Sequence, residues 1–558
     1  MDGWGTQWFY WWVGRQLLSG EGLASTDVLF FPWGKEVYLH TGGNVLDAAA
    51  ALPVRWFLGP VAGYNVFAGL VLVVNALALS RLAGVLGAKP EAAWIAGALF
   101  AFNPFALQEL VDGRPTQAMM AFLVLFLAEV ALCVRGRDAH APWRAGGLLL
   151  LTALGYWFYA FFGGVAALAA GAWGVVTAPR ARRAATLGRL GLAAALGLLL
   201  TLPFALPMLG ASEQVPGLLD SEALSLTQWR PSTREGIGVG IYVLDLLHRV
   251  AGFLVESKDE PGLLVFVPED RVLLWTQLGA AAVGLAIWPT RWRGFVLALA
   301  GAALLIALGP MIQLGDVDLP NVPYLAMILG APLLRRLWWP QRALAVVSIA
   351  LAVAAAFALS RVQRLGRVAL AGATALVALA WAVELSANGL APLPTWSARV
   401  PAVYRCLARA GLPGAVIELP YASTQQHLFY QAIHGRKIFG GMVEDNLTFT
   451  PPGQVEFRRA NSLVRTLLAA AADAPFEEAP SEADTAAVGA LGYRYVVFDK
   501  SAYPAAAANG ARVDTRAEGR GRAVLSAITS VLGPPDYQDD DSALWAPWGG
   551  GDPCDDPG

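Results

Sequence analysis

Long apolar segments recur along the first 390 residues, and they constrain the fold more than any other feature of the chain. A membrane-spanning helix needs about 20 predominantly apolar residues. Of the 558 residues, 56% are hydrophobic and 15% are charged, whereas soluble domains carry about 25% charged residues. The segments long enough to be spans are 61–80, 92–107, 115–134, 145–177, 190–211, 272–289, 294–309, 343–360 and 368–388.

The connections between these segments predict how the chain is inserted. Alternate connections are rich in arginine and lysine, and by the positive-inside rule these lie on the cytoplasmic side. The alternation holds only if 145–177 contains two helices, with GYWFYAFFGG at the turn, which gives ten spans. The arginines and lysines of the cytoplasmic set are Arg81, Lys89, Arg135, Arg137, Arg144, Arg180, Arg182, Arg183, Arg189, Arg291, Arg293, Arg361, Arg364 and Arg367.

This topology predicts a mainly α, polytopic membrane bundle with its N-terminus outside. The start MDGWGTQWFYWW is no signal peptide, so either the chain inserts with its N-terminus outside or a first helix is missing from it; we favour the missing helix. Residues 1–60 form a first outer loop, in which the Trp-rich start and 45–58 are expected to be interfacial helices. The transmembrane bundle is 61–388.

The chain changes character near residue 390. Apolar strand patterns such as GAVIELP and YRYVVFD alternate with helical ones, which predicts a small extracytoplasmic α/β domain over 389–545. Residues 546–558 are expected to be disordered. Spacing alone leaves open whether Cys406 and Cys554 form a disulfide.

Candidate site residues lie in the predicted outer loops. Glu109, Asp112 and Arg114 share the turn LQELVDGRPTQ, where they either form a metal or phosphate site or are solvated. His40 is an acid–base or substrate-binding candidate, although a lone loop histidine is more often structural. Arg336 and Arg342 belong to LLRRLWWPQR and suit a lipid phosphate or an interfacial anchor.

The absences matter as well. The net charge of −2 and the lack of a basic, aromatic-rich patch exclude a nucleic-acid partner. No Cys/His cluster with zinc spacing and no glycine-rich nucleotide motif is present. Polar residues gather at the outer edge instead of the middle of the spans, and this distribution is less typical of a transporter.

Several segments together resemble the GT-C superfamily of membrane glycosyltransferases, in particular bacterial members with a small C-terminal outer domain. They are the Trp-rich first loop with its FFPWG turn, VAGYNVFAGLVLVVNALALSRLAG with AGALFAFNPFALQELVDG, the segment from LGPMIQLGDVDLP to PQR, and GAVIELP with YQAIHGRKIFGGM. The resemblance implies an enzyme of the cytoplasmic membrane that moves a sugar from a polyprenyl-phosphate donor to a glycan, lipid or protein acceptor outside.

The resemblance also implies roles for residues. The essential carboxylate of the first outer loop maps to Asp2, and a divalent metal (Mg or Mn) would be held by Asp2, Glu109 and Asp112. Arg342, Arg336, Arg114 and His40 would contact the donor, and Trp8 would offer a stacking face to the sugar. The remaining alternative is a non-catalytic scaffold or a translocation component for envelope polysaccharide.

Overall fold

The computed structural model divides the chain into two compact units, each described here by itself. Residues 1–43 and 396–558 belong to the first unit, and 44–395 belong to the second. The described residues are 3–37, 45–213, 254–256, 264–266, 275–288, 290–309, 311–314, 317–330, 340–393, 395, 397–410, 413–421, 425–441, 450–475, 479–500, 515–549 and 554.

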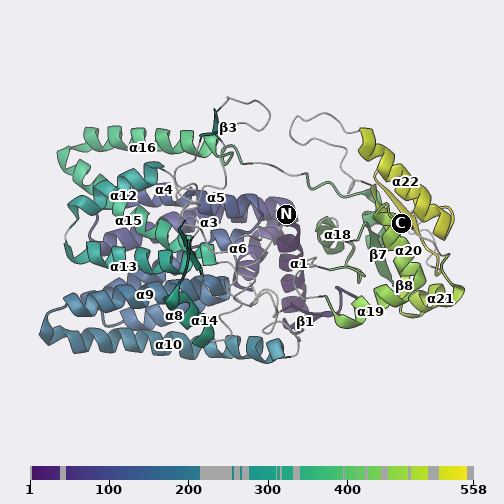
Figure 1. The fold of residues 1–558 in the computed structure, drawn as a ribbon, viewed down its shortest axis with the longest axis horizontal. Coiled ribbons are helices and arrows are strands. Elements are labelled where there is room, and N and C mark those ends of the chain that lie inside the picture. The colour runs from purple at the N-terminus through teal and green to yellow at the C-terminus, as the bar shows by residue number, and fades with distance from the viewer. Residues whose placement is uncertain are drawn as a thin grey trace. The chain divides into compact units, whose positions relative to one another are not determined.

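The second unit is a bundle of helices that lie alongside one another (Figure 1). Seven helical segments in its described part are long and apolar enough to cross a membrane, so the predicted mainly α, polytopic fold is confirmed. The helices are α3 (Val45–Leu86), α4 (Pro90–Ala101), α5 (Pro104–Val111), α6 (Pro115–Ala118), α7 (Ala121–Arg135), α8 (Ala141–Gly155), α9 (Trp157–Thr177), α10 (Arg180–Glu213), α12 (Trp275–Ile287), α13 (Thr290–Ala307), α14 (Val322–Gly330), α15 (Leu344–Val362) and α16 (Arg367–Ala387).

Short elements complete this unit. Among the described residues of this unit there are two pairs of antiparallel strands and two 3-10 turns. They are β3 (Leu254–Glu256) with β4 (Leu264–Phe266), β5 (Met311–Leu314) with β6 (Val317–Pro320), η3 (Pro340–Ala343) and η4 (Gln363–Leu365).

Each of the ten predicted spans overlaps one or two of these helices, although only seven helical segments of the described chain meet the length and apolarity of a membrane span. The segment 145–177 does contain two helices, α8 and α9, and Tyr156 between them is extended (φ −157°, ψ 113°). The predicted helix at 45–58 also exists, as the first part of α3. It ends at Gly59, whose φ of 77° lies outside the helical region, and Pro60 then begins the next helical part.

Small residues allow the bundle helices to pack closely. Gly97 of α4 faces α3, where an added Cβ would lie 2.4 Å from the Ala76 carbonyl oxygen. Ser80 of α3 donates to the carbonyls of Ala76 (2.8 Å) and Ala93 (3.1 Å). Glycine and serine at helix contacts are common inside membranes because they let backbones approach.

A buried carboxylate joins three helices at one end of the bundle. Glu129 of α7 is 2% exposed and accepts from Arg81 of α3 (2.6 Å) and Arg144 of α8 (2.8 Å). Asp138 also accepts from Arg144 but is more exposed. Because Glu129 has two cationic partners and little contact with solvent, it stabilises the meeting point of α3, α7 and α8.

We expect Glu129→Ala to lower the free energy of unfolding by about 2 kcal/mol, because charged hydrogen bonds inside the bundle are lost. Asp138→Ala should cost under about 1 kcal/mol, since its ion pair is partly solvated. Thermal unfolding of both variants in detergent measures the difference. Equal losses for the two variants would show that Glu129 does not have this role.

The first unit contains a four-stranded sheet of order β7-β8-β10-β9. β7 (Ala415–Leu419) and β8 (Tyr493–Asp499) are parallel, and β10 (Ser542–Trp545) is antiparallel to both β8 and β9 (Tyr537–Gln538). The helices of this unit are α1 (Gly3–Ser19), α17 (Ala402–Arg409), α18 (Gln426–His434), α19 (Pro452–Ala460), α20 (Ser462–Ala471), α21 (Glu482–Ala490) and α22 (Thr515–Leu532), and β1 (Ser25–Thr26) pairs with β2 (Lys35–Glu36).

Residues of the predicted first outer loop are part of this α/β unit. α1 packs on α18, and Phe31 N donates to the Ile438 carbonyl at 3.0 Å while Ile438 N donates to the Val28 carbonyl at 2.9 Å. The unit therefore combines two distant parts of the sequence. Its boundaries differ from the predicted 1–60 and 389–545, which separated these parts.

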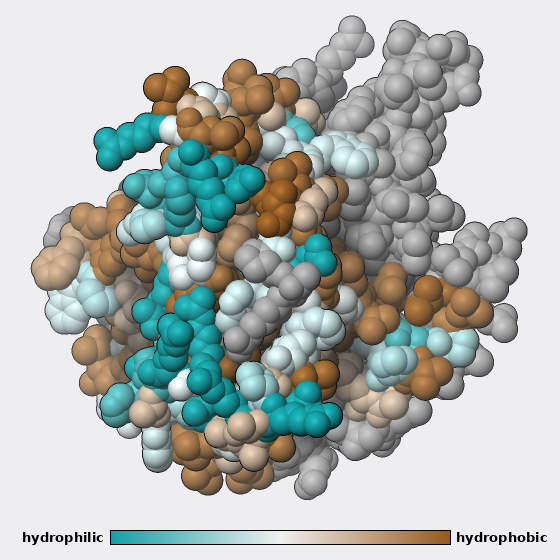
Figure 2. Space-filling view, turned by 90° about the vertical axis from the view of Figure 1, so that its left-hand side faces the viewer, coloured by the Kyte–Doolittle hydropathy of each residue, from teal (hydrophilic) through white to brown (hydrophobic). Residues whose placement is uncertain are grey.

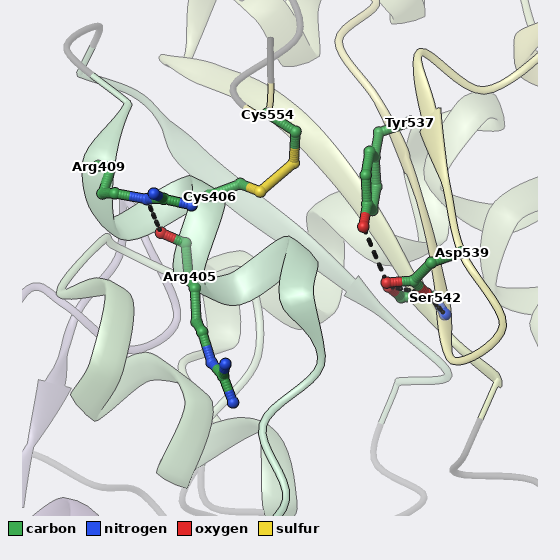
Figure 3. The surroundings of a disulfide bond; sticks show 7 residues. All are labelled: Arg405, Cys406, Arg409, Tyr537, Asp539, Ser542 and Cys554. Carbon is green, nitrogen blue, oxygen red and sulfur yellow. Dashed lines mark hydrogen bonds between the residues drawn. A yellow bond between two sulfur atoms is a disulfide. The ribbon is translucent and has the colours of Figure 1, made fainter. Parts of the chain in front are cut away.

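The C-terminal end of the chain is covalently attached to the same unit. Cys554 forms a disulfide with Cys406 of α17, and Figure 3 shows this bond beside α17. Nearby, Tyr537 and Ser542 both donate to the Asp539 carboxylate, at 3.0 and 2.9 Å. The structure thus resolves the cysteine pairing that the sequence left open, and it places Cys554 of the predicted disordered tail in a bond.

Polar groups are buried at the carboxyl ends of β7 and β8. Glu418 lies 3.7 Å from His434 (Oε1 to Nε2), and neither carboxylate oxygen has a hydrogen-bond donor. Burial, together with Asp499, raises the pKa of Glu418 well above its usual value, while burial and Arg436 lower the pKa of His434 to about 3. Burial thus favours the neutral form of both side chains.

This arrangement predicts a pH-dependent stability. An acid whose pKa is raised on folding loses stability as pH rises above its unfolded pKa, and a histidine whose pKa is lowered loses stability as pH falls below about 6.5. We expect Glu418→Gln to raise the melting temperature at pH 8 by several degrees and to change it little at pH 4. Exposed Glu456 provides the control variant Glu456→Gln. Equal shifts at both pH values would contradict the burial of a protonated Glu418.

Candidate functional site

The helical path from α4 to α7 is interrupted three times, before α5, α6 and α7, and these interruptions position polar side chains. Asn103 caps α5 by accepting from Ala106 N (3.0 Å), and Pro104 takes the first helical position. Asn75 of α3 holds the third interruption, since it donates to the Ala118 carbonyl and accepts from Met120 N, at 2.8 and 2.9 Å. Asparagine at such breaks satisfies backbone groups that a continuous helix would have paired.

Glu109, Asp112 and Arg114 are brought together by this fold. The Arg114 Nη1 atom lies 3.4 Å from Glu109 Oε2 and 3.3 Å from Asp112 Oδ2. Gly113 between them has φ 79°, which makes the turn tight. Glu109 belongs to α5 and is only 7% exposed. The sequence placed it in an outer turn, but the helix buries it.

Arg342 comes from another part of the chain and interacts electrostatically with the same carboxylate. It lies in η3, just before α15, and donates to the hydroxyl of Tyr156. Its guanidinium carbon is 5.5 Å from the ring centroids of both Tyr156 and Phe158. Arg342 and Arg114 are the two positive charges that act on Glu109. The two aromatic rings and the Tyr156 hydroxyl together fix the plane of the Arg342 guanidinium.

We call Glu109, Asp112, Arg114, Tyr156 and Arg342 the Glu109 cluster. Its five residues come from three separate regions of the second unit, namely α5 with the turn after it, the α8–α9 junction and η3. The planar guanidiniums of Arg114 and Arg342 can donate hydrogen bonds to the oxygens of a phosphate in place of a carboxylate. The cluster is therefore suited to an anionic group with oxygen acceptors.

Tyr156 is the residue that sequence reasoning missed. It lies in GYWFYAFFGG, which the sequence identified only as an aromatic turn between helices. The structure buries Tyr156 and pairs it with Arg342, 186 residues away. The signal that existed was a tyrosine at a helix break, because its hydroxyl must find a partner when the ring is buried.

Trp8 does not present a stacking face in the first unit. Its side chain is 0% exposed, stacks on Trp12 (ring centroids 5.7 Å apart) and donates from Nε1 to Gln431 Oε1 at 2.6 Å. The predicted interfacial helix is a buried helix of the α/β unit. The predicted sugar contact at Trp8 is therefore incompatible with its position, because every face of the indole is covered by protein.

Three predicted site residues lie outside the described part of the chain. They are Asp2, His40 and Arg336. Their predicted roles stay predictions.

Two of the three carboxylates of the predicted metal site, Glu109 and Asp112, lie in the described part of the chain. Glu109 and Asp112 both face the Arg114 guanidinium, at 3.4 and 3.3 Å, so a cation between them would meet a positive charge. Within the described residues there is no group of three or more His, Cys, Asp or Glu side chains that could hold a metal. As placed, the two carboxylates do not fit a divalent ion.

The comparisons with known proteins found similarity among solved structures alone. No protein-family model and no curated protein matches the chain. Among solved structures, the oligosaccharyltransferase of Archaeoglobus fulgidus, solved in complex with Zn and sulfate, matches with a TM-score of 0.49 and 14% identity over 89% of this chain. The chain spans 64% of that protein's length.

Proposed function

We propose that this protein is a membrane glycosyltransferase that moves a sugar from a polyprenyl-phosphate donor to an acceptor outside the cytoplasmic membrane. The observation that carries the proposal is the Glu109 cluster at a break between membrane helices, where Arg114 pairs with the buried Glu109 carboxylate and Arg342 interacts electrostatically with it. A lipid phosphate is a group that such a pair of guanidiniums binds well. The sequence resemblance to GT-C enzymes points in the same direction.

In the proposed reaction the donor's phosphate binds at Arg342 and Arg114. The bond between the anomeric carbon and the phosphate oxygen breaks, and a bond forms from that carbon to an acceptor hydroxyl. The leaving phosphate gains negative charge, which the two guanidiniums stabilise. Asp2 takes the proton of the acceptor hydroxyl as general base.

The side of the membrane is part of the proposal. The disulfide between Cys406 and Cys554 supports an oxidising compartment for the α/β unit, since disulfides persist outside the cytoplasm. The basic connections between helices of the bundle support a cytoplasmic side for the helix ends that they join. The acceptor is a glycan, lipid or protein of the cell envelope of a bacterium.

The test is a transfer assay in membranes that contain the full chain. A panel of polyprenyl-phosphate sugars with labelled sugar is supplied, and label in polymer, lipid or protein is measured for wild type and Asp2→Asn. We expect transfer from one donor and its loss in Asp2→Asn. Transfer that survives Asp2→Asn would discard the base assignment, and no transfer from any donor would count against the enzyme in favour of a scaffold.

A further inference from the structure

One end of the helix bundle carries exposed arginines that belong to three connections. Figure 2 shows hydrophilic residues gathered on this face, with hydrophobic ones around them. Contacts bring these connections to one end of the bundle. Lys89 N, between α3 and α4, donates to Ser360 Oγ of α15 (3.0 Å), and Arg81 of α3 pairs with Glu129 of α7. The α7–α8 connection lies against α10, since a Cβ added at Gly136 would be 2.4 Å from Arg189 Nη1. We call the exposed arginines the basic end face, which consists of Arg137, Arg180, Arg182, Arg183, Arg361, Arg364 and Arg367.

The acidic residues at this end are already engaged elsewhere. Glu129 pairs with Arg81 and Arg144, Asp138 pairs with Arg144, and Glu91 accepts from Gln363. Across the described part of the chain, none of the seven arginines of the basic end face forms an ion pair with a carboxylate. Arg183 alone is held by backbone, since it donates to the carbonyls of Ala178 and Val176. Glu91 does interact electrostatically with Arg367, but the arginines outnumber the acidic residues at this end, so the face has a net positive charge.

Tryptophans mark where this face lies in the bilayer. Trp94, Trp143 and Trp173 are 56%, 59% and 40% exposed, and they lie near this end of α4, α8 and α9. Exposed indoles concentrate at the level of lipid headgroups, with their rings among the acyl chains and their N–H groups toward water. The arginines of the basic end face thus lie at the depth where phosphates of the adjoining leaflet are found.

We propose that the basic end face binds the headgroups of anionic phospholipids in the adjoining leaflet. Each arginine near an anionic membrane surface strengthens the binding of the protein to that surface about fivefold. Planar guanidiniums also hydrogen-bond to the phosphate oxygens. A zwitterionic headgroup offers the same phosphate but adds a positive charge that the face repels. This inference does not depend on the proposed glycosyl transfer.

The test compares two lipids on the purified full-length protein. Phosphatidylglycerol and phosphatidylcholine of equal chain length are titrated in detergent, and bound lipid is counted by native mass spectrometry. The wild type should bind phosphatidylglycerol at least about tenfold more strongly. R361Q/R364Q/R367Q should lose most of this preference, and R180Q/R182Q, on a different connection, should lose part of it.

The control R409Q/R459Q/R522Q removes the same charge from exposed positions of the α/β unit and should keep the preference. Glycerol 3-phosphate, which is the headgroup without chains, should not compete at equal concentration. Equal binding of the two lipids by wild type would overturn the proposal. So would an equal loss in the control variant, or full competition by glycerol 3-phosphate, since the partner would then be a free phosphate compound.

Discussion

Arg342→Ala should reduce the rate of sugar transfer by about 10²-fold or more, while the protein stays folded in the membrane. Removal of a preorganised donor to a developing negative charge typically costs about 10²- to 10³-fold. Arg342 is held for this task by Tyr156 and by the Phe158 ring, and it acts on Glu109. The initial rate per amount of folded protein, at saturating donor, is the measurement.

Two further variants separate position from charge. Arg342→Lys keeps the charge but loses the planar fork, so it should recover only part of the rate. Tyr156→Phe keeps the ring and removes the hydroxyl that accepts from Arg342, and we expect about a tenfold fall in rate. Arg364→Ala, at the basic end face, is the matched control and should transfer sugar normally. An Arg342→Ala protein with wild-type rates would remove the Glu109 cluster from the mechanism.

Trp8→Ala should destabilise the α/β unit by about 3–5 kcal/mol, the usual cost of deleting a large buried aromatic side chain. Trp8 is fully buried between Trp12 and Gln431, and Gln431 also donates to the Val28 carbonyl at 2.7 Å. Loss of the indole would leave a cavity and an unpaired amide oxygen. Chemical unfolding followed by near-ultraviolet circular dichroism measures the cost.

Trp11→Ala is the matched variant for Trp8→Ala. Trp11 belongs to the same helix, and it is only partly buried. We expect it to cost under half as much. If the two variants cost the same, or if Trp8→Ala leaves stability unchanged, α1 is not an integral part of the α/β unit.

The helices of the bundle were predictable because their signal is local. A span of about 20 apolar residues must be helical in lipid, where every backbone group needs an internal partner. The division of 145–177 followed from the charge of the flanking loops, and the structure confirms two helices on either side of Tyr156. The helix breaks at Gly59 and Asn103 were also predictable, because glycine, asparagine and the prolines that follow them favour the end of one helix and the start of the next.

The tertiary contacts of the candidate site could not be predicted in this way. Arg342 was identified because arginine suits phosphate, but its partner Tyr156 lies 186 residues away. Glu109 was placed in an outer turn, either as part of a metal or phosphate site or as a solvated residue. Its burial depends on how α5 folds back into the bundle, and no residue pattern within α5 encodes that.

The position of α1 was missed for a related reason. Its aromatic residues look the same whether they face lipid headgroups or a protein core. The partner that decides between them, Gln431, is 423 residues further along the chain. A Trp-rich helix is therefore ambiguous in isolation, and here the protein core provides the environment that the sequence assigned to the membrane interface.

A comparison of two donors shows whether the sugar comes from a lipid phosphate. A single labelled sugar is supplied to membranes with the full chain, once on polyprenyl phosphate and once on a nucleoside diphosphate, and the initial transfer rates are compared in wild type and Arg342→Ala. We expect transfer only from the polyprenyl-phosphate donor and its loss in Arg342→Ala. Transfer from the nucleotide donor alone, or a lipid-donor rate that does not change in Arg342→Ala, would contradict it.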